Sequence, residues 1–316
     1  MSESQNISQS ILEKLAPDYR QFLEANPPQT RPLHGLAWSP VFRQPPPGGL
    51  PNTGAMSPIP VGSQRVIELG DFSIQVMTPE GEKPDQGWPV VLYAHGGGWV
   101  FGAAAMDNGF LSRLCVEGEA ELGIDIKRIA VMGGSAGANL VAVLAQHACL
   151  SSPKIPLVFQ VLVVPVIDAS FSATDRSNWT PSMIENEHIF SLPTLNMLWL
   201  RDRYLPNVGD RTKPEASPIY QENKAAFEGM PHTWIAVAEL DALRSEGEMY
   251  AEKLQQFGVP VTLKVLKGLT HVAPKADRIC ATARASRDDL IDAFKVAFVP
   301  RLVTLATSVF IGCQRL

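Results

Sequence analysis

Five runs of mostly apolar residues recur along the chain with the length expected of buried β-strands. The first four do not alternate cleanly between apolar and polar positions, which is typical of strands that helices cover on both faces. Helical spacing of apolar residues falls between the runs, notably over residues 138–149 and 245–257. The pattern therefore predicts an α/β fold with a mostly parallel sheet and helices on both faces. The five runs are residues 89–97, 128–137, 158–168, 233–243 and 261–268.

Upstream of these runs, two shorter segments predict an antiparallel pair of strands. Residues 65–69 and 72–78 are separated by Gly70 and Asp71, a two-residue connection that suits a hairpin turn. Nearer the N-terminus, residues 7–25 show an amphipathic helical pattern that is broken near Pro17. The proline-rich and glycine-rich stretch that follows is expected to run irregularly over a surface.

Residues 169–230 interrupt the alternation of strands and helices. Their aromatic and apolar residues do not resemble a sheet strand, and a helical cap over the carboxyl ends of the strands is the better interpretation. Ligands of open α/β sheets bind at that end, so such a cap would enclose a ligand. Phe190, Met197 and Trp199 are candidates for lining a pocket there, although ordinary packing is favoured by their helical spacing.

The composition favours a globular protein that acts on a small molecule. Of the 316 residues, 45% are hydrophobic and 19% charged, so one large core is expected. A net charge of -5 removes the electrostatic basis for a nucleic-acid partner. The four cysteines form no CxxC pair, which predicts reduced thiols rather than disulfides or a bound metal. The chain begins without the features of a secretory signal, and no apolar run has the length of a membrane span. We therefore expect a cytoplasmic protein without stable membrane insertion.

A serine flanked by glycines is the first candidate for chemistry. Gly133-Gly134-Ser135-Ala136-Gly137 directly follows an apolar run and directly precedes a helical pattern. A nucleophile elbow requires this context, because the serine must stand on a sharp turn between a strand and a helix. The same five-residue sequence is also compatible with a glycine-rich turn that contains a helix-capping serine, or with a phosphate-binding loop.

A second glycine run, HGGGWVFG at residues 95–102, follows the preceding apolar run. Successive glycines let backbone N–H groups approach a substrate closely, as an oxyanion hole requires. The expected donors are the N–H groups of Gly97, Gly98 and Ala136, with His95 and Gly96 supporting the loop. A phosphate-binding role is less favoured, because no Gly-Lys-Ser/Thr follows.

The order of the acidic and histidine residues completes the pattern. A serine nucleophile needs a histidine base, which in turn needs a carboxylate, and in this type of fold they follow in the order Ser, Asp, His. Asp241 ends one apolar run and His271 follows the last one. The other histidines lie too early in the chain, on the helix after Ser135, in the cap or before a strand. The reserve acids are Glu239, Glu246 and Asp168.

Taken together, these motifs resemble those of the hormone-sensitive-lipase-like family of α/β-hydrolases, particularly its fungal and bacterial esterases. The resemblance covers most of residues 89–271 and implies an α/β-hydrolase fold that needs no cofactor. It assigns the nucleophile to Ser135, the acid to Asp241 and the base to His271. Gly134 and Ser245 stand where the family often has Asp. The motifs that carry the resemblance are HGGGWVFG, GIDIKRIAVMGGSAGANL, ASPIY, ELDALRSEGEMYAEKL and GVPVTLKVLKGLTH.

One part of the family pattern is missing. The family has a further core strand and helix before the nucleophile strand, and here both are absent between residues 115 and 124. That strand would sit between the hairpin and the strand before the glycine run, so its loss predicts a gap in the sheet or a hairpin that pairs elsewhere. The rest of the chain divides into an N-terminal cap or lid segment at 1–62, hydrolase core at 63–168 and 231–300, the cap insertion at 169–230 and a C-terminal tail at 301–316.

The sequence thus predicts a serine carboxylesterase that hydrolyses a short-chain or acetyl ester of a small hydrophobic molecule. The resemblance to fungal esterases makes an intermediate of secondary metabolism a candidate substrate. Two alternatives stay open: a non-catalytic protein that binds a small molecule on the same fold, and an inactive truncated variant. The presence of His271 favours the enzyme, because the hormone receptors of this family lack that histidine.

Overall fold

The computed structural model describes residues 7–28, 32–40, 52–70, 72–82, 89–117 and 129–298, together with the backbone of residues 309–315. The described strands form one eight-stranded sheet in the order β1-β2-β8-β3-β4-β5-β6-β7. Strands β3 to β7 are parallel to their neighbours, as predicted from their apolar runs. They are β3 (Val90–Ala94), β4 (Ile129–Gly134), β5 (Leu157–Val163), β6 (Thr233–Leu240) and β7 (Val261–Thr270).

The predicted hairpin consists of β1 (Ser63–Glu68) and β2 (Phe72–Thr78), which pair antiparallel. Its turn is closed by the N–H of Leu69, which donates to the carbonyl oxygen of Phe72 at 2.8 Å. Gly70 adopts a φ of +77°, a conformation that glycine reaches without steric cost. The predicted turn residue Asp71 lies outside the described residues.

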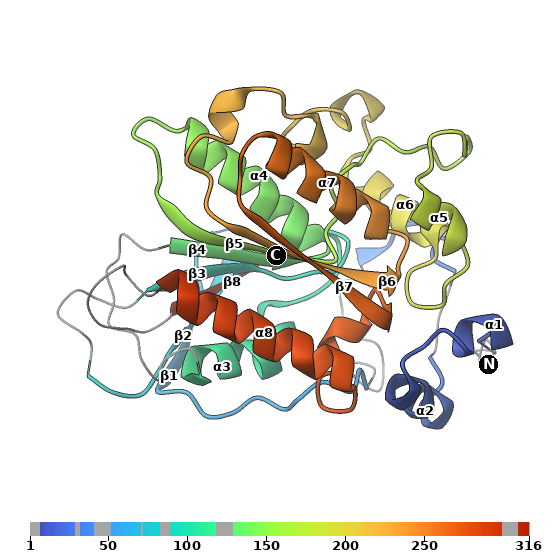
Figure 1. Ribbon diagram of the computed structural model, residues 1–316, viewed down its shortest axis with the longest axis horizontal. Helices are drawn as coiled ribbons and strands as arrows, with labels where there is room; N and C mark the ends of the chain where they lie inside the picture. Colours follow the sequence, from blue (N-terminus) through green and yellow to red (C-terminus); the bar gives the residue numbers. More distant parts are fainter. Residues whose placement is uncertain are drawn as a thin grey trace.

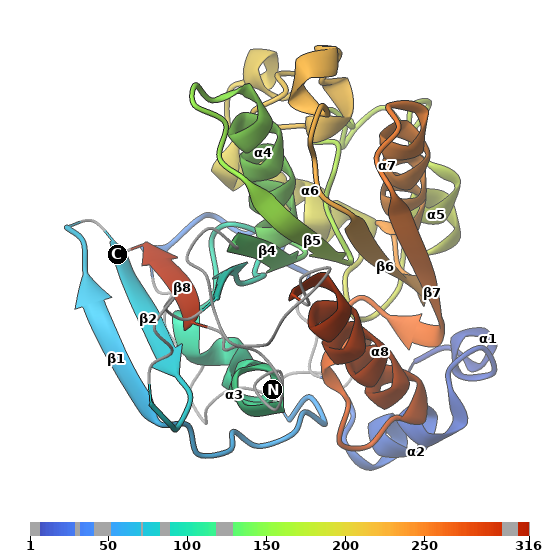
Figure 2. The same cartoon turned by 60° about the vertical axis from the view of Figure 1, so that its left-hand side comes forward.

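Helices cover both faces of the sheet (Figure 2). α4 (Ala136–Leu150) and α7 (Arg244–Gln256) lie on one face, where they correspond to the two predicted helical patterns. α3 (Asn108–Glu117) and α8 (Ala281–Phe298) lie on the other. This arrangement explains why the runs that form β4, β5 and β6 do not alternate, since most of their residues are shielded from solvent, whereas β7 keeps several exposed residues.

The N-terminal segment forms two short helices, α1 (Gln9–Leu12) and α2 (Pro17–Ala25) (Figure 1). Pro17 begins α2, where a missing N–H costs nothing, so the break in the helical pattern falls at the predicted proline. The buried side chains of Leu15 and Tyr19 belong to the main core. In addition, the N–H of Ala16 donates to the carbonyl oxygen of Gly268 at 3.0 Å. This segment therefore packs on the end of β7.

Within the predicted cap, residues 169–230 form α5 (Pro181–Glu185), α6 (Thr194–Tyr204) and three single 3-10 turns, namely η3 (Val208–Asp210), η4 (Pro218–Tyr220) and η5 (Lys224–Ala226). Met183, Met197 and Leu198 pack with Ala242 and Leu243, just beyond the end of β6. Phe190, Met197 and Trp199 are all buried, as the packing interpretation predicts.

Of the two expected consequences of the missing strand, a gap in the sheet or a hairpin that pairs elsewhere, the structure shows the second. Residues 309–315 form β8 (Val309–Arg315), which pairs antiparallel with β2 and parallel with β3. Part of the predicted C-terminal tail therefore belongs to the core, and the hairpin joins the sheet through it. The segment between 115 and 124, where a strand and helix are expected to be missing, lies mostly outside the described residues.

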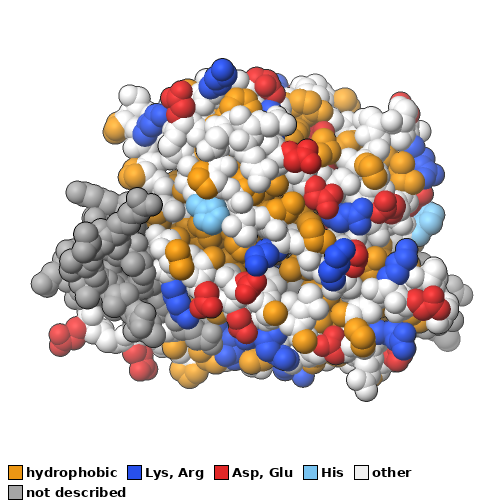
Figure 3. All heavy atoms as spheres, viewed as in Figure 1, with side chains coloured by type: hydrophobic (Ala, Val, Ile, Leu, Met, Phe, Trp, Pro, Cys, Tyr) orange, Lys and Arg blue, Asp and Glu red, His pale blue; other side chains and the backbone are white. Residues whose placement is uncertain are grey.

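The surface carries acidic and basic side chains side by side on the face seen in Figure 3, without a broad basic area. In the described part of the chain, none of the helices is long and apolar enough to cross a bilayer.

Candidate active site

Ser135 stands on the sharp turn between β4 and α4. Its φ of 54° and ψ of -121° lie in a region that side-chain-bearing residues rarely adopt, which marks a strained and over-determined position. The flanking glycines allow this turn. A Cβ atom on Gly133 would clash with the backbone of Gly137, and one on Gly137 would clash with the carbonyl group of Ala94. The backbone N–H of Ser135 donates to the carbonyl oxygen of Val163 at 2.8 Å, which ties the turn to the end of β5.

The structure brings the three predicted residues together. His271 Nε2 lies 2.9 Å from Ser135 Oγ, and His271 Nδ1 lies 2.8 Å from Asp241 Oδ2. An ionised carboxylate only accepts hydrogen bonds, so Nδ1 of a neutral His271 carries the proton and Nε2 is left to accept from the serine hydroxyl. This chain of hydrogen bonds is the arrangement in which a histidine can remove a proton from a serine.

Further hydrogen bonds, from groups other than His271, hold Asp241 in place. Asp241 is 1% exposed, and its Oδ1 accepts from the N–H of Leu243 at 3.1 Å. Asn186 in the cap donates to the backbone carbonyl of Asp241 at 3.3 Å. Sequence reasoning missed Asn186, because no motif surrounds it and its contact depends on how the cap folds back over β6.

The reserve acids are engaged elsewhere. Glu239 accepts from Lys267 Nζ and from the N–H of Gly268, both at 2.8 Å. Asp168 accepts from Tyr220 Oη at 3.1 Å. Glu246 accepts from two backbone N–H groups. Each of these carboxylates thus has a structural partner of its own, and the contact to His271 is made by Asp241.

The glycine loop runs beside the serine. A Cβ atom on Gly96 would lie 3.4 Å from Ser135 Cβ, so the loop and the nucleophile elbow are in contact. Gly97 and Gly98 adopt φ values of +124° and +59°, and a Cβ atom on Gly98 would lie 2.7 Å from Leu200 in α6. The loop therefore lies between the elbow and the cap, and at Gly97 and Gly98 there is no space for a side chain.

His95 packs inside this loop. Its Nδ1 lies 2.7 Å from the carbonyl oxygen of Gly96, and a Cβ atom on Gly102 would lie 2.7 Å from the same nitrogen. These contacts join the start of the loop to its end. Such contacts are expected of a residue that stabilises the conformation of the loop.

Glu246 is a buried acid beneath the elbow. It is 2% exposed, and its Oε2 accepts from the N–H groups of Ile167 and Asp168 at 2.8 and 2.9 Å. Burial is the largest influence and raises the pKa of Glu246 to about 8, assisted by the charges of Asp168 and Asp241, against the two backbone hydrogen bonds. The side chain is therefore mostly protonated at neutral pH, and it fixes the segment that leaves β5 under Ser135.

This buried acid should make the protein less stable at alkaline pH. Because the folded state holds the proton more tightly than the unfolded state, the free energy of unfolding should fall as pH rises from about 4.5 to about 8 and then level off. The loss is on the order of a few kcal/mol. Glu246→Gln keeps an acceptor for both N–H groups and should remove this dependence. Denaturant unfolding of both proteins at pH 5, 7 and 9 tests this, and parallel pH dependence in the two would contradict it.

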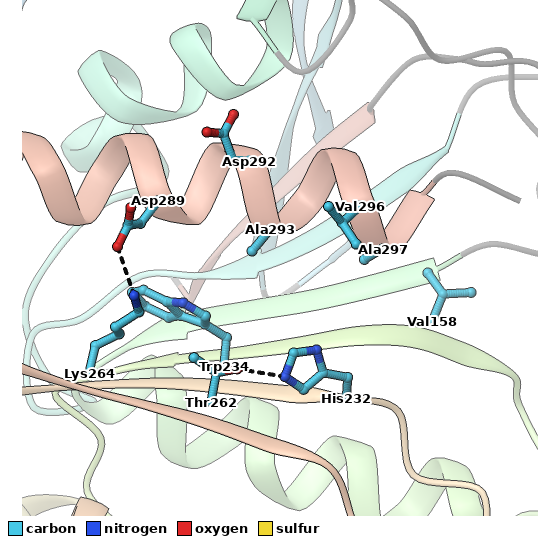
Figure 4. Close-up of a pocket in the computed structure, with 10 residues that line it drawn as sticks. All are labelled: Val158, His232, Trp234, Thr262, Lys264, Asp289, Asp292, Ala293, Val296 and Ala297. Atoms are coloured by element: carbon cyan, nitrogen blue, oxygen red, sulfur yellow. Dashed lines mark hydrogen bonds and ion pairs between the residues drawn. The ribbon is translucent and has the colours of Figure 1, made fainter.

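A groove lies at the opposite end of the sheet (Figure 4). It has a volume of about 360 Å³ and lies between α8 and the amino ends of β5, β6 and β7. His232, Thr262 and Lys264 line it, with Lys264 paired to Asp289 at 2.8 Å. The predicted site residues are at the carboxyl ends of the strands, so this groove is separate from them.

Comparison with known proteins agrees with the fold. Residues 115–275 match a family model described as alpha/beta hydrolase fold. An AB hydrolase superfamily protein of Schizosaccharomyces pombe is 30% identical over 92% of this chain and 96% of its own length. Carboxylesterase NlhH of Mycobacterium tuberculosis is 32% identical over 64% of this chain and 71% of its own. A solved structure, a thermostable esterase from Pseudomonas putida, superposes with a TM-score of 0.72 at 25% identity and covers 94% of this chain and 100% of its own.

Proposed function

The chain belongs to the alpha/beta hydrolase family, and from that premise we propose that it is a carboxylic ester hydrolase with Ser135 as its nucleophile. The observation that carries the proposal is the continuous hydrogen bonding from Asp241 through His271 to Ser135, beside the glycine loop. Relatives named as an ethyl acetate hydrolase and as carboxylesterases support the same reaction.

In the proposed reaction, Ser135 Oγ attacks the acyl carbon of the ester while His271 Nε2 takes the hydroxyl proton. Asp241 stabilises the resulting imidazolium and holds its orientation. The N–H groups of Gly97, Gly98 and Ala136 donate to the oxyanion of the tetrahedral intermediate. When the intermediate collapses, His271 gives its proton to the leaving alcohol. Water then attacks the acyl-enzyme by the same route and releases the acid.

The proposed substrate is a short-chain or acetyl ester of a small hydrophobic molecule, such as an intermediate of secondary metabolism. The short acyl group is supported by the side chains that border the glycine loop on the cap side. Leu200 lies against Gly98, and the ring of Trp99 stacks on that of Tyr204 with centroids 4.7 Å apart. Because these bulky side chains lie close to the proposed oxyanion donors, they restrict the space beside the loop, which favours a small acyl group over a long one.

A fluorophosphonate probe tests the proposal, because it reacts with a serine that an adjacent base activates. We expect stoichiometric labelling, with the modified peptide containing Ser135, and faster hydrolysis of p-nitrophenyl acetate than of p-nitrophenyl octanoate. Ser151→Ala, which removes a hydroxyl bonded to Ala148 at the end of α4, should label like the wild type. A folded protein that is neither labelled nor active would refute the proposal and favour the non-catalytic binding protein, whereas an aggregated chain would favour the inactive variant.

A further inference from the structure

A buried polar cluster lies next to the candidate active site, between the segments that flank the glycine loop and His271, and is not part of the site. Its members are Tyr93, Asp107 and Lys275. Tyr93 Oη donates to Asp107 Oδ2 at 2.6 Å, and Lys275 Nζ pairs with Asp107 Oδ1 at 2.5 Å. Asp107 and Tyr93 are 6% and 4% exposed, whereas the side chain of Lys275 is 38% exposed. We refer to these three residues as the Asp107 cluster.

The charge on Asp107 depends on its two partners. Burial opposes ionisation of this carboxyl, but the charge of Lys275 and the hydrogen bonds from Lys275 and Tyr93 outweigh burial, so the pKa of Asp107 is lowered. Burial and the adjacent carboxylate raise the pKa of Tyr93 well above its usual value, which keeps its hydroxyl protonated as a donor. At neutral pH the cluster therefore consists of an ion pair between Asp107 and Lys275, to which the Tyr93 hydroxyl adds a hydrogen bond. Losing one partner would leave a buried charge poorly compensated.

The cluster joins the segments that bear the proposed catalytic groups. Tyr93 lies in β3, two residues before His95 and the glycine loop. Asp107 ends η2 (Ala104–Asp107), the short helix that follows the loop. Lys275 ends η6 (Ala273–Lys275), which begins two residues after His271. A Cβ atom on Gly134 would lie 3.8 Å from Tyr93 Oη, so the same hydroxyl also lies near the nucleophile elbow.

We infer that Asp107 and Lys275 are positioning residues for the proposed reaction, which hold the segment after His271 at a fixed distance from the glycine loop. The inference rests on the proposed function. A base and a set of oxyanion donors on separate segments act together only if the distance between them is fixed before the substrate reacts. The Asp107–Lys275 pair is a direct tie between these segments. Releasing it should allow the His271 segment to shift, which lowers kcat while substrate binding on the cap side changes little.

The decisive variant is Lys275→Met, because Lys275 is the partly exposed partner and the hydrogen bond from Tyr93 to Asp107 stays in place. Since Asp107 loses its counter-charge, the variant should be less stable than the wild type, so kinetics and exchange are measured well below its unfolding temperature. We expect kcat for p-nitrophenyl acetate to fall by about 10-fold to 100-fold with KM within about two-fold of wild type, since a displacement near 1 Å can have an effect of that size. Lys275→Arg should restore most of the activity. Lys264→Met is the matched control, since it removes a similarly exposed lysine from an ion pair with Asp289, in the groove of Figure 4.

A readout without turnover separates this inference from the proposed function. Hydrogen–deuterium exchange of the peptide containing residues 271–276 should increase in Lys275→Met and remain at the wild-type level in Lys264→Met. An unchanged kcat together with unchanged exchange overturns the inference, as does a rise in KM alone, or an equal loss of kcat in Lys264→Met. Failure of the proposed function is seen instead in the wild-type protein, as an absence of probe labelling and ester hydrolysis.

Discussion

Ser135→Ala should lower kcat/KM for p-nitrophenyl acetate by about four to six decades, because the members of a triad act as a unit and the nucleophile cannot be replaced by its partners. The hydroxyl removed is the one 2.9 Å from His271 Nε2. Rates are measured with the purified variant at high concentration, so that a contaminating esterase contributes little. The residual rate of the variant should not fall after treatment with a fluorophosphonate probe, because the variant lacks the serine that the probe would modify. KM is uninformative at such low rates, so the comparison is made on kcat/KM.

The backbone at Ser135 provides a control for this variant. Its φ of 54° is strained for alanine as well as for serine, so Ser135→Ala should unfold at the wild-type temperature. Ser135→Gly should be equally inactive yet no less stable, because glycine adopts this conformation without a Cβ clash. Activity of Ser135→Ala within about ten-fold of wild type would assign the chemistry to another residue and would remove the basis of the proposed mechanism.

Much of the fold could be predicted because its signals are local. The parallel strands are continuous apolar runs that end in glycines or polar residues, and the hairpin is marked by Gly70. The candidate triad could be predicted because each member follows a strand, and parallel strands bring their carboxyl ends to one edge of the sheet. Asp241 stands two residues nearer the following loop than the reserve acid Glu239, and the hydrogen bond to His271 is made by Asp241.

The contacts that could not be predicted are those between distant segments without a motif. Asp107 is an isolated acid in a short helix, and nothing local indicates that Lys275 pairs with it. The sequence offers Glu246 only as a reserve acid for the triad, whereas the structure buries it and bonds it to two backbone N–H groups. Residues 309–315 form a short apolar segment near the chain end, and their place in the sheet depends on the free edges of β2 and β3 rather than on their own pattern.

That C-terminal strand leads to a second large effect, on stability. A variant that ends at Ser308 lacks β8, and with it the pairing from Phe72 with Arg315 to Met77 with Phe310, and from Val90 with Val309 to Tyr93 with Gly312. Among the described strands, β8 is the connection between the β1–β2 hairpin and the parallel strands. Val91 and Met77, which are 0% and 1% exposed, lie on the strands whose edges would open.

We expect the variant that ends at Ser308 to be aggregated or to lose several kcal/mol of stability, a large part of the roughly 5–15 kcal/mol typical of a folded protein. Two open strand edges inside a sheet are also templates for association with other chains. Ile311→Pro should have a similar effect in the full chain, because proline cannot donate to the ladder of a central strand. Thermal unfolding and size-exclusion chromatography measure the outcome.

A variant lacking Leu316 alone is the control for this truncation and should match the wild type, since β8 ends at Arg315. If the chain ending at Ser308 remained monomeric with an unchanged unfolding temperature, the hairpin would have to be held by contacts other than β8. In that case the tail would lie outside the sheet. Loss of the fold would instead establish that the end of the chain completes the sheet on which the glycine loop and Ser135 are built.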